Sequence, residues 1–106
     1  MAEAKKIENV SVDPKANIYF DGKVVSHSIY DKAGRKTTLG LIYPGTYKFN
    51  TGAPELMTIT AGSCRVHLAS GANGTYAAGG AFSVPGNSSF TISVDGGICE
   101  YICEFK

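Results

Sequence analysis

Short apolar stretches recur about every ten residues along the chain, and glycine, proline, aspartate or asparagine separates them. Within these stretches apolar and polar residues alternate, which is the two-residue period of a β-strand with one buried face. From residue 17 onward no segment carries apolar residues at helical spacing over three turns. Many short, evenly spaced strands are typical of a β-sandwich or barrel. The pattern predicts strands over Asn17–Phe20, Lys23–Tyr30, Thr37–Tyr43, Thr46–Thr51, Leu56–Thr60, Cys64–Ala69, Ala81–Val84, Ser89–Val94 and Ile98–Phe105.

The same alternation predicts which side chains face inward. In most of the clearest rows a polar residue stands beside a turn and apolar residues follow it, which is the layout of a barrel with a polar mouth and an apolar floor. The inward rows are Tyr47, Phe49, Thr51 and Ala53; Glu55, Met57, Ile59 and Ala61; Ser88, Phe90, Ile92 and Val94; and Cys99, Tyr101, Cys103 and Phe105.

The length of 106 residues allows one domain. Residues 1–16 are charged and weakly patterned, and they end near the turn-like pair Asp13-Pro14. We therefore expect a loose N-terminal arm over residues 1–16 and a barrel over residues 17–106. The 13 glycines and only 4 prolines point to many tight turns.

Composition excludes several classes of partner. The net charge is +1 and only 18% of residues are charged, so no electrostatic footprint for nucleic acid is present. No stretch approaches the roughly 18 apolar residues of a membrane span, and the N-terminus lacks the apolar run of a signal peptide. We expect a cytoplasmic protein without a membrane partner. The three cysteines include no CxxC pair, which predicts buried free thiols in a reducing compartment.

Two spaced motifs stand out along the chain, and their fixed positions are Gly45, Glu55, Gly62, Gly79 and Pro85. They resemble the motifs of the cupins, which implies an all-β, single-domain cupin (jelly-roll) barrel. Thr51, Ala53 and Phe90 stand at the usual histidine positions. A cupin metal centre needs about three converging imidazole or carboxylate ligands, and here Glu55 alone is left. We expect His27 and His67 to be structural or neutral, and we expect no metal.

Several longer motifs follow one another along the chain: Tyr19-Phe20-Asp21-Gly22-Lys23, Tyr47-x-Phe49-x-Thr51, Pro54-Glu55-x-Met57-Thr58 and Phe82-Ser83-Val84-Pro85-Gly86. Together they resemble a small family of bacterial cupins, the pyrimidine/purine nucleoside phosphorylases. The resemblance implies phosphorolysis of a broad range of purine and pyrimidine nucleosides to free base and ribose 1-phosphate. It also implies inorganic phosphate as co-substrate, no other cofactor, and a homodimer.

Phosphorolysis requires a group that stabilises the ribose as positive charge builds at its anomeric carbon. Glu55 is the only carboxylate with inward parity, so it is the candidate for that role. Alternatively, Glu55 supports the barrel by accepting hydrogen bonds from its backbone. Thr51 is the second candidate at the reacting centre.

No Walker-type glycine loop is present, so phosphate would be held by hydroxyls and one cation. The candidates are Arg35, Thr38 and Ser88, although Arg35 follows a turn and would equally suit a solvated hairpin tip. Met57, Phe90 and Tyr101 are candidates for an unselective slot for bases, or are simply core. Two other functions remain open: a non-enzymatic cupin that binds a sugar or small anion, and, less favoured, a metal-dependent cupin enzyme.

Overall fold

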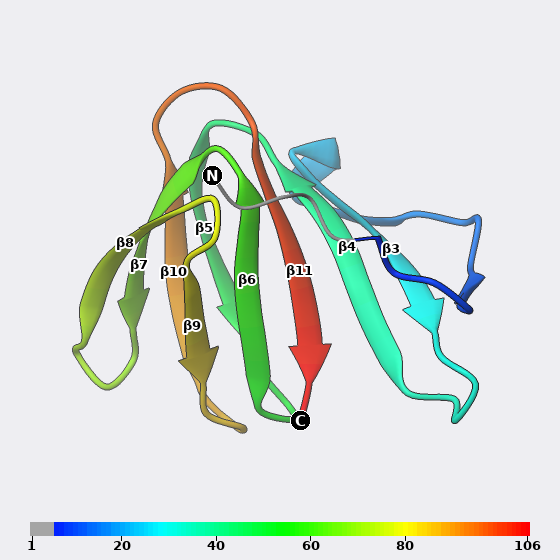
Figure 1. Cartoon of the computed structure of the whole chain (residues 1–106). Helices are drawn as coiled ribbons and strands as arrows, with labels where there is room; N and C mark the ends of the chain where they lie inside the picture. The colour runs from blue at the N-terminus through cyan, green and yellow to red at the C-terminus, as the bar shows by residue number, and fades with distance from the viewer. Residues whose placement is uncertain (1–5) are drawn as a thin grey trace.

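The computed structural model describes residues 6–106, which form two antiparallel β-sheets and a single 3-10 turn (Figure 1). No helix in this part of the chain is long and apolar enough to cross a bilayer. The elements are β1 (Ser11–Val12), β2 (Asn17–Tyr19), η1 (Phe20–Gly22), β3 (Val24–Tyr30), β4 (Lys36–Ile42), β5 (Gly45–Asn50), β6 (Glu55–Ala61), β7 (Ser63–Leu68), β8 (Asn73–Ala77), β9 (Ala81–Val84), β10 (Ser89–Val94) and β11 (Cys99–Phe105).

The larger sheet has the strand order β1-β3-β4-β11-β6-β9, with β2 also paired to β3, and the smaller has the order β5-β10-β7-β8. Figure 1 shows β7, β8 and β10 on one side of the molecule and β3, β4 and β11 on the other. Within residues 6–106, strand pairing occurs only inside each sheet. The all-β prediction is therefore confirmed, whereas strand pairing does not close the two sheets into one barrel.

The core lies between the two sheets and consists mainly of the predicted inward rows. Ile59, Ile92 and Cys99 have no exposed surface. Two members of the rows are exceptions: Ala53 is exposed because β5 ends at Asn50, and Phe105 is exposed at the end of β11. All three cysteines are buried free thiols, as predicted.

The pattern missed two strands. Gly74 made residues 73–77 resemble a turn, but they form β8, where the Tyr76 ring fills the space beside Gly74. Ser11 and Val12 lie in the expected arm and pair with Tyr30 and Ile29 as β1. Both are exposed, so they carry no alternating signal. Residues 1–5 of that arm lie outside the described residues.

The turn from β2 to β3 carries backbone strain. Phe20 and Asp21 have φ values of 52° and 56°, and Gly22 follows with 88°. A left-handed non-glycine residue costs roughly 1–3 kcal/mol. The Phe20 ring lies 5.0 Å from that of Tyr47 and 5.4 Å from that of Phe49, and such aromatic packing offsets part of the cost. This turn thereby connects an outer strand of the larger sheet to β5 of the smaller one.

A close approach between Gly40 and Tyr101 shapes the middle of the larger sheet. The two residues are paired between β4 and β11. A Cβ atom at Gly40 would lie 2.3 Å from Cζ of Tyr101, so the ring lies across the glycine. The absence of a side chain at residue 40 is what allows the Tyr101 ring to occupy this position.

We predict that Gly40→Ala lowers the free energy of unfolding by about 1–3 kcal/mol, because the new methyl group displaces a buried ring. Gly96→Ala is the matched control, since a Cβ there meets nothing within 4 Å, and it should change stability by less than about 0.5 kcal/mol. Urea denaturation of both variants measures the effect. Equal stability of the two variants would contradict the proposed packing.

Candidate functional site

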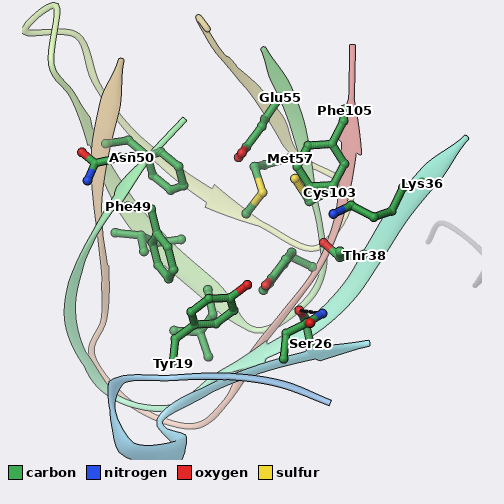
Figure 2. Close-up of a pocket in the computed structure, with 15 residues that line it drawn as sticks. Tyr19, Ser26, Lys36, Thr38, Phe49, Asn50, Glu55, Met57, Cys103 and Phe105 are labelled. Atoms are coloured by element: carbon green, nitrogen blue, oxygen red, sulfur yellow. Dashed lines mark hydrogen bonds between the residues drawn. The ribbon is translucent and has the colours of Figure 1, made fainter. Parts of the chain in front are cut away.

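A cavity of about 280 Å³ lies between the two sheets, and Figure 2 shows the residues around it. The larger sheet contributes most of its polar lining, including Lys36 and Thr38 from β4 and Glu55 from β6. The smaller sheet contributes mainly apolar side chains, such as Phe49 from β5 and Phe90 from β10. The cavity therefore has one polar wall and one apolar wall.

Several of the predicted site residues meet in this cavity although they come from four different strands. They are Thr38, Glu55, Met57, Phe90 and Tyr101.

The structure does not bring Arg35 to the cavity lining. Its side chain is 83% exposed, and its Nε donates a hydrogen bond of 2.9 Å to Oδ2 of Asp31 in the hairpin between β3 and β4. A backbone hydrogen bond from Arg35 is the largest of the effects that lower the pKa of Asp31. Arg35 thus stands at a solvated hairpin tip.

Thr51 and Ser88 also lie outside the lining, where they connect two loops to each other. The Thr51 hydroxyl donates a 2.7 Å hydrogen bond to the Pro85 carbonyl and accepts one of 2.9 Å from the Ser88 backbone N–H. The Thr51 N–H in turn donates to the Ser88 carbonyl at 2.9 Å. These bonds hold the segment after β5 against the turn before β10.

Glu55 begins β6 and is only partly buried among the lining residues. Burial raises the pKa of its carboxyl group, and a hydrogen bond with the Cys103 thiol acts in the opposite direction. Burial, followed by the charge of Glu55, raises the pKa of Cys103 to about 12, so this thiol stays protonated and can donate. The Cys103 thiol therefore neighbours this carboxylate in the cavity.

Lys36 is the cation that the sequence analysis missed. It lines the cavity, and its Nζ lies 4.9 Å from the centroid of the Phe105 ring. Lys36 and Thr38 are two residues apart on β4, so both point to the same side of the sheet. This parity was the available signal, but the predicted strand began one residue too late to include Lys36.

The sequence pattern also did not identify a polar group formed by Asn17, Ser26 and Ser28. The Asn17 side-chain amide donates hydrogen bonds to the hydroxyls of Ser26 and Ser28, at 3.2 and 3.1 Å. Burial raises the pKa of the neighbouring Tyr101 phenol, an effect that a hydrogen bond with Ser26 opposes. The phenol therefore stays neutral at physiological pH and can donate a hydrogen bond. The alternation of Val24, Ser26 and Ser28 was the signal for their inward direction.

The apolar wall is aromatic. The rings of Phe49 and Phe90 are stacked, with centroids 5.7 Å apart, and the Tyr19 ring meets Phe49 nearly at right angles at 6.0 Å. Tyr19 and Phe49 both line the cavity but were not among the predicted site residues. Tyr19 and Phe49 lie on strands of different sheets. The alternation of residues along a single strand does not predict such a contact.

Among residues 6–106 no group of three or more His, Cys, Asp or Glu side chains is placed to hold a metal ion. His67 is exposed on β7, where its ring hydrogen-bonds to the Asn73 side chain. The cavity instead combines one carboxylate, one ammonium group, neutral hydroxyls and aromatic rings. Such a set suits a ligand with an anionic part, hydroxyl groups and a flat ring.

Comparison with known proteins gives a consistent match. The family model described as pyrimidine/purine nucleoside phosphorylase matches residues 14–105. A protein of that name from Cupriavidus pinatubonensis is 56% identical over 97% of this chain and 98% of its own length. Another from Aromatoleum aromaticum is 51% identical over 99% of each chain.

Solved structures agree with this fold. A protein of unknown function from Acinetobacter sp. ADP1 superposes with a TM-score of 0.89 at 38% identity, covering 95% of this chain and 98% of that one. The EutQ protein of Clostridium difficile superposes with a TM-score of 0.65 at 14% identity, covering 77% of this chain and 67% of that one. The EutQ likeness concerns the fold alone.

We predict that Glu55→Gln becomes more stable relative to the wild type as the pH rises. The folded protein holds the Glu55 proton more tightly than the unfolded chain, whose carboxyl has the ordinary pKa of 4.5. The wild type therefore loses this stabilisation as the pH rises from 4.5 through the higher folded-state pKa, whereas glutamine does not ionise. Urea denaturation between about pH 4 and pH 8 measures the difference, with the exposed Glu100→Gln as control. A difference that is constant across this range would refute the shift.

Proposed function

The chain belongs to the pyrimidine/purine nucleoside phosphorylase family, and we propose that it catalyses the phosphorolysis of purine and pyrimidine nucleosides in the cavity between its sheets. In this reaction the bond between the anomeric carbon and the base nitrogen breaks, and a phosphate oxygen forms the new bond. The base nitrogen takes up a proton, so the products are a free base and ribose 1-phosphate. The observation that carries the proposal is the cavity's combination of a carboxylate, an ammonium group and an aromatic wall.

Glu55 has the role of stabilising the ribose. As the base departs, positive charge builds at the anomeric carbon, and a carboxylate in a poorly solvated site stabilises that charge more than it stabilises the neutral substrate. Its partial burial and its place in the cavity lining beside the Cys103 thiol support this role, because they put the carboxylate where the ribose would lie. Glu55 can also accept hydrogen bonds from the ribose hydroxyls.

Lys36 and Thr38 have the role of holding phosphate. An ammonium group and a hydroxyl on one side of β4 supply a charge and a hydrogen-bond donor to the same anion. Lys36 is exposed and Thr38 is buried, so the pair extends from the rim of the cavity inward. Arg35, the cation expected from the sequence, lies outside the lining and points into its pair with Asp31.

The neutral Tyr101 phenol has the role of donating a hydrogen bond to the nucleoside. Ser26 contacts this phenol, and Asn17 orients Ser26 in turn. Met57 and Phe90 supply apolar contact surface for the base. Because apolar and stacking contacts do not depend on the base edge, this arrangement accepts both purines and pyrimidines.

We also propose that the two sheets form a cupin jelly roll, that turnover needs no metal, and that the chain is a cytoplasmic homodimer. The fold likeness to EutQ supports the first point, and Thr51 and Phe90 at the cupin histidine positions support the second. The exposed apolar side chains of Val12 and Ile18 support a homodimer, since they offer a surface for a second copy.

The proposed reaction predicts cleavage of a nucleoside panel that requires phosphate and continues in EDTA, with equal yields of base and ribose 1-phosphate. Glu55→Gln should lower kcat/KM by about 100-fold or more, which corresponds to about 2.7 kcal/mol of lost transition-state stabilisation. Equal cleavage without phosphate would indicate a hydrolase. Nucleoside binding without any turnover would favour the non-enzymatic alternative, a protein that binds a sugar or small anion.

For the phosphate site, we predict that Lys36→Gln raises the KM for phosphate about tenfold or more, because a charge-assisted hydrogen bond is lost. The KM for nucleoside should change little. Lys48→Gln on the exposed side of β5 removes the same charge and should leave both constants unchanged. Arg35→Gln separates the two cations: a large effect there, with none from Lys36→Gln, would assign phosphate to the hairpin tip instead.

A further inference from the structure

The segment Tyr19–Lys23 belongs to the family resemblance, and the proposed reaction has not used it. Its residues Phe20 and Asp21 adopt the left-handed conformation that bulky side chains avoid. Strand β2 holds this segment to β3 through only three residue pairs. Such strain persists only where the surrounding structure imposes it, and it is concentrated at ligand sites.

Aromatic contacts hold the turn in this left-handed conformation. The Phe20 ring lies against Tyr47 and Phe49, both on β5 of the smaller sheet. The turn itself is closed by one hydrogen bond of 3.1 Å from the Lys23 N–H to the Phe20 carbonyl. Phe20 therefore fixes the end of β2 against the opposite sheet.

The residue before this anchor is Tyr19, which lines the cavity. Figure 2 shows Tyr19 beside Phe49, with its hydroxyl directed into the space between the walls. Phe90 is buried and Phe49 is half-buried, whereas Tyr19 keeps 45% of its surface exposed. Of the three rings, Tyr19 therefore has the most surface free to contact a ligand.

We propose that Tyr19 is a substrate-binding residue that forms one side of the nucleobase subsite, and that Phe20 is the positioning residue that holds it there. This inference rests on the proposed phosphorolysis.

The arrangement of the walls assigns the base to these rings. Lys36, Thr38 and Glu55 lie on the larger sheet and suit the phosphate and the ribose, whereas the wall of Tyr19, Phe49 and Phe90 offers no charge. Every base has a π-face, so aromatic rings bind purines and pyrimidines alike. Purines present the larger face, and Tyr19 should therefore contribute more to their binding.

We expect Tyr19→Ala to lower kcat/KM for a purine nucleoside about tenfold or more, with a smaller loss for uridine and an unchanged KM for phosphate. Phe20→Ala should show the same pattern although Tyr19 remains present, and Phe20→Tyr should restore activity because it keeps the ring. Tyr43→Ala is the matched control, since Tyr43 is also a tyrosine, is 42% exposed and does not line the cavity. The control should match the wild type.

Calorimetric titration with free adenine and free uracil tests the subsite apart from turnover. Weaker adenine binding by Tyr19→Ala and Phe20→Ala, at melting temperatures close to that of the wild type, supports the proposal. Unchanged adenine binding by folded Tyr19→Ala would overturn it, as would equal losses for phosphate and nucleoside. If the wild type binds adenine but does not turn nucleosides over, the proposed reaction fails while the subsite stands.

Discussion

The position of the Tyr101 ring over Gly40 sets the boundary between the core and the cavity. On one side of it, the inward rows of β6 and β11 reach Ile59 and Cys99, which have no exposed surface. On the other side, Thr38, Met57 and Cys103 line the cavity, and the rows of β4 and β6 continue to Lys36 and Glu55. Polarity thus increases along β4 and β6, and these rows are aligned with β11 because the register of the strands is fixed. A site with a dry floor and a charged rim follows from that register.

This arrangement explains how a small chain can combine stability with a polar cavity. The buried apolar side chains at one end of each central strand stabilise the two sheets. The inward side chains at the other end can therefore be groups that do not stabilise the fold. Glu55 is the clearest case, because burial disfavours its charged form. The strained turn at Phe20 is another, since its conformation is offset by aromatic packing rather than favoured by its own backbone. Glu55 lines the cavity, and the strained turn directly follows Tyr19, which lines it as well.

The sequence pattern was sufficient for the inward rows of β6, β10 and β11, because a two-residue period fixes the face of every side chain in a regular strand. It failed where strands end. The alternation predicts a strand that continues to Thr51, but β5 ends at Asn50 and the Thr51 hydroxyl donates to the Pro85 carbonyl. The predicted strand starts at Thr37, whereas β4 starts at Lys36. The prediction therefore leaves Lys36 outside the strand and out of the row that contains Thr38. The contact of Tyr19 with Phe49 joins two sheets, and no local pattern contains that information.

The strand order also has a consequence for synthesis of the chain. Strand β11 is last in sequence order, yet it lies between β4 and β6 in the larger sheet (Figure 1). During translation, β4 and β6 therefore present unpaired edges until the ribosome has made residues 99–105. Exposed strand edges are templates for pairing with other chains. Insertion of β11 covers both of these edges, and the same step joins the two halves of the larger sheet and brings Tyr101 and Cys103 to the cavity.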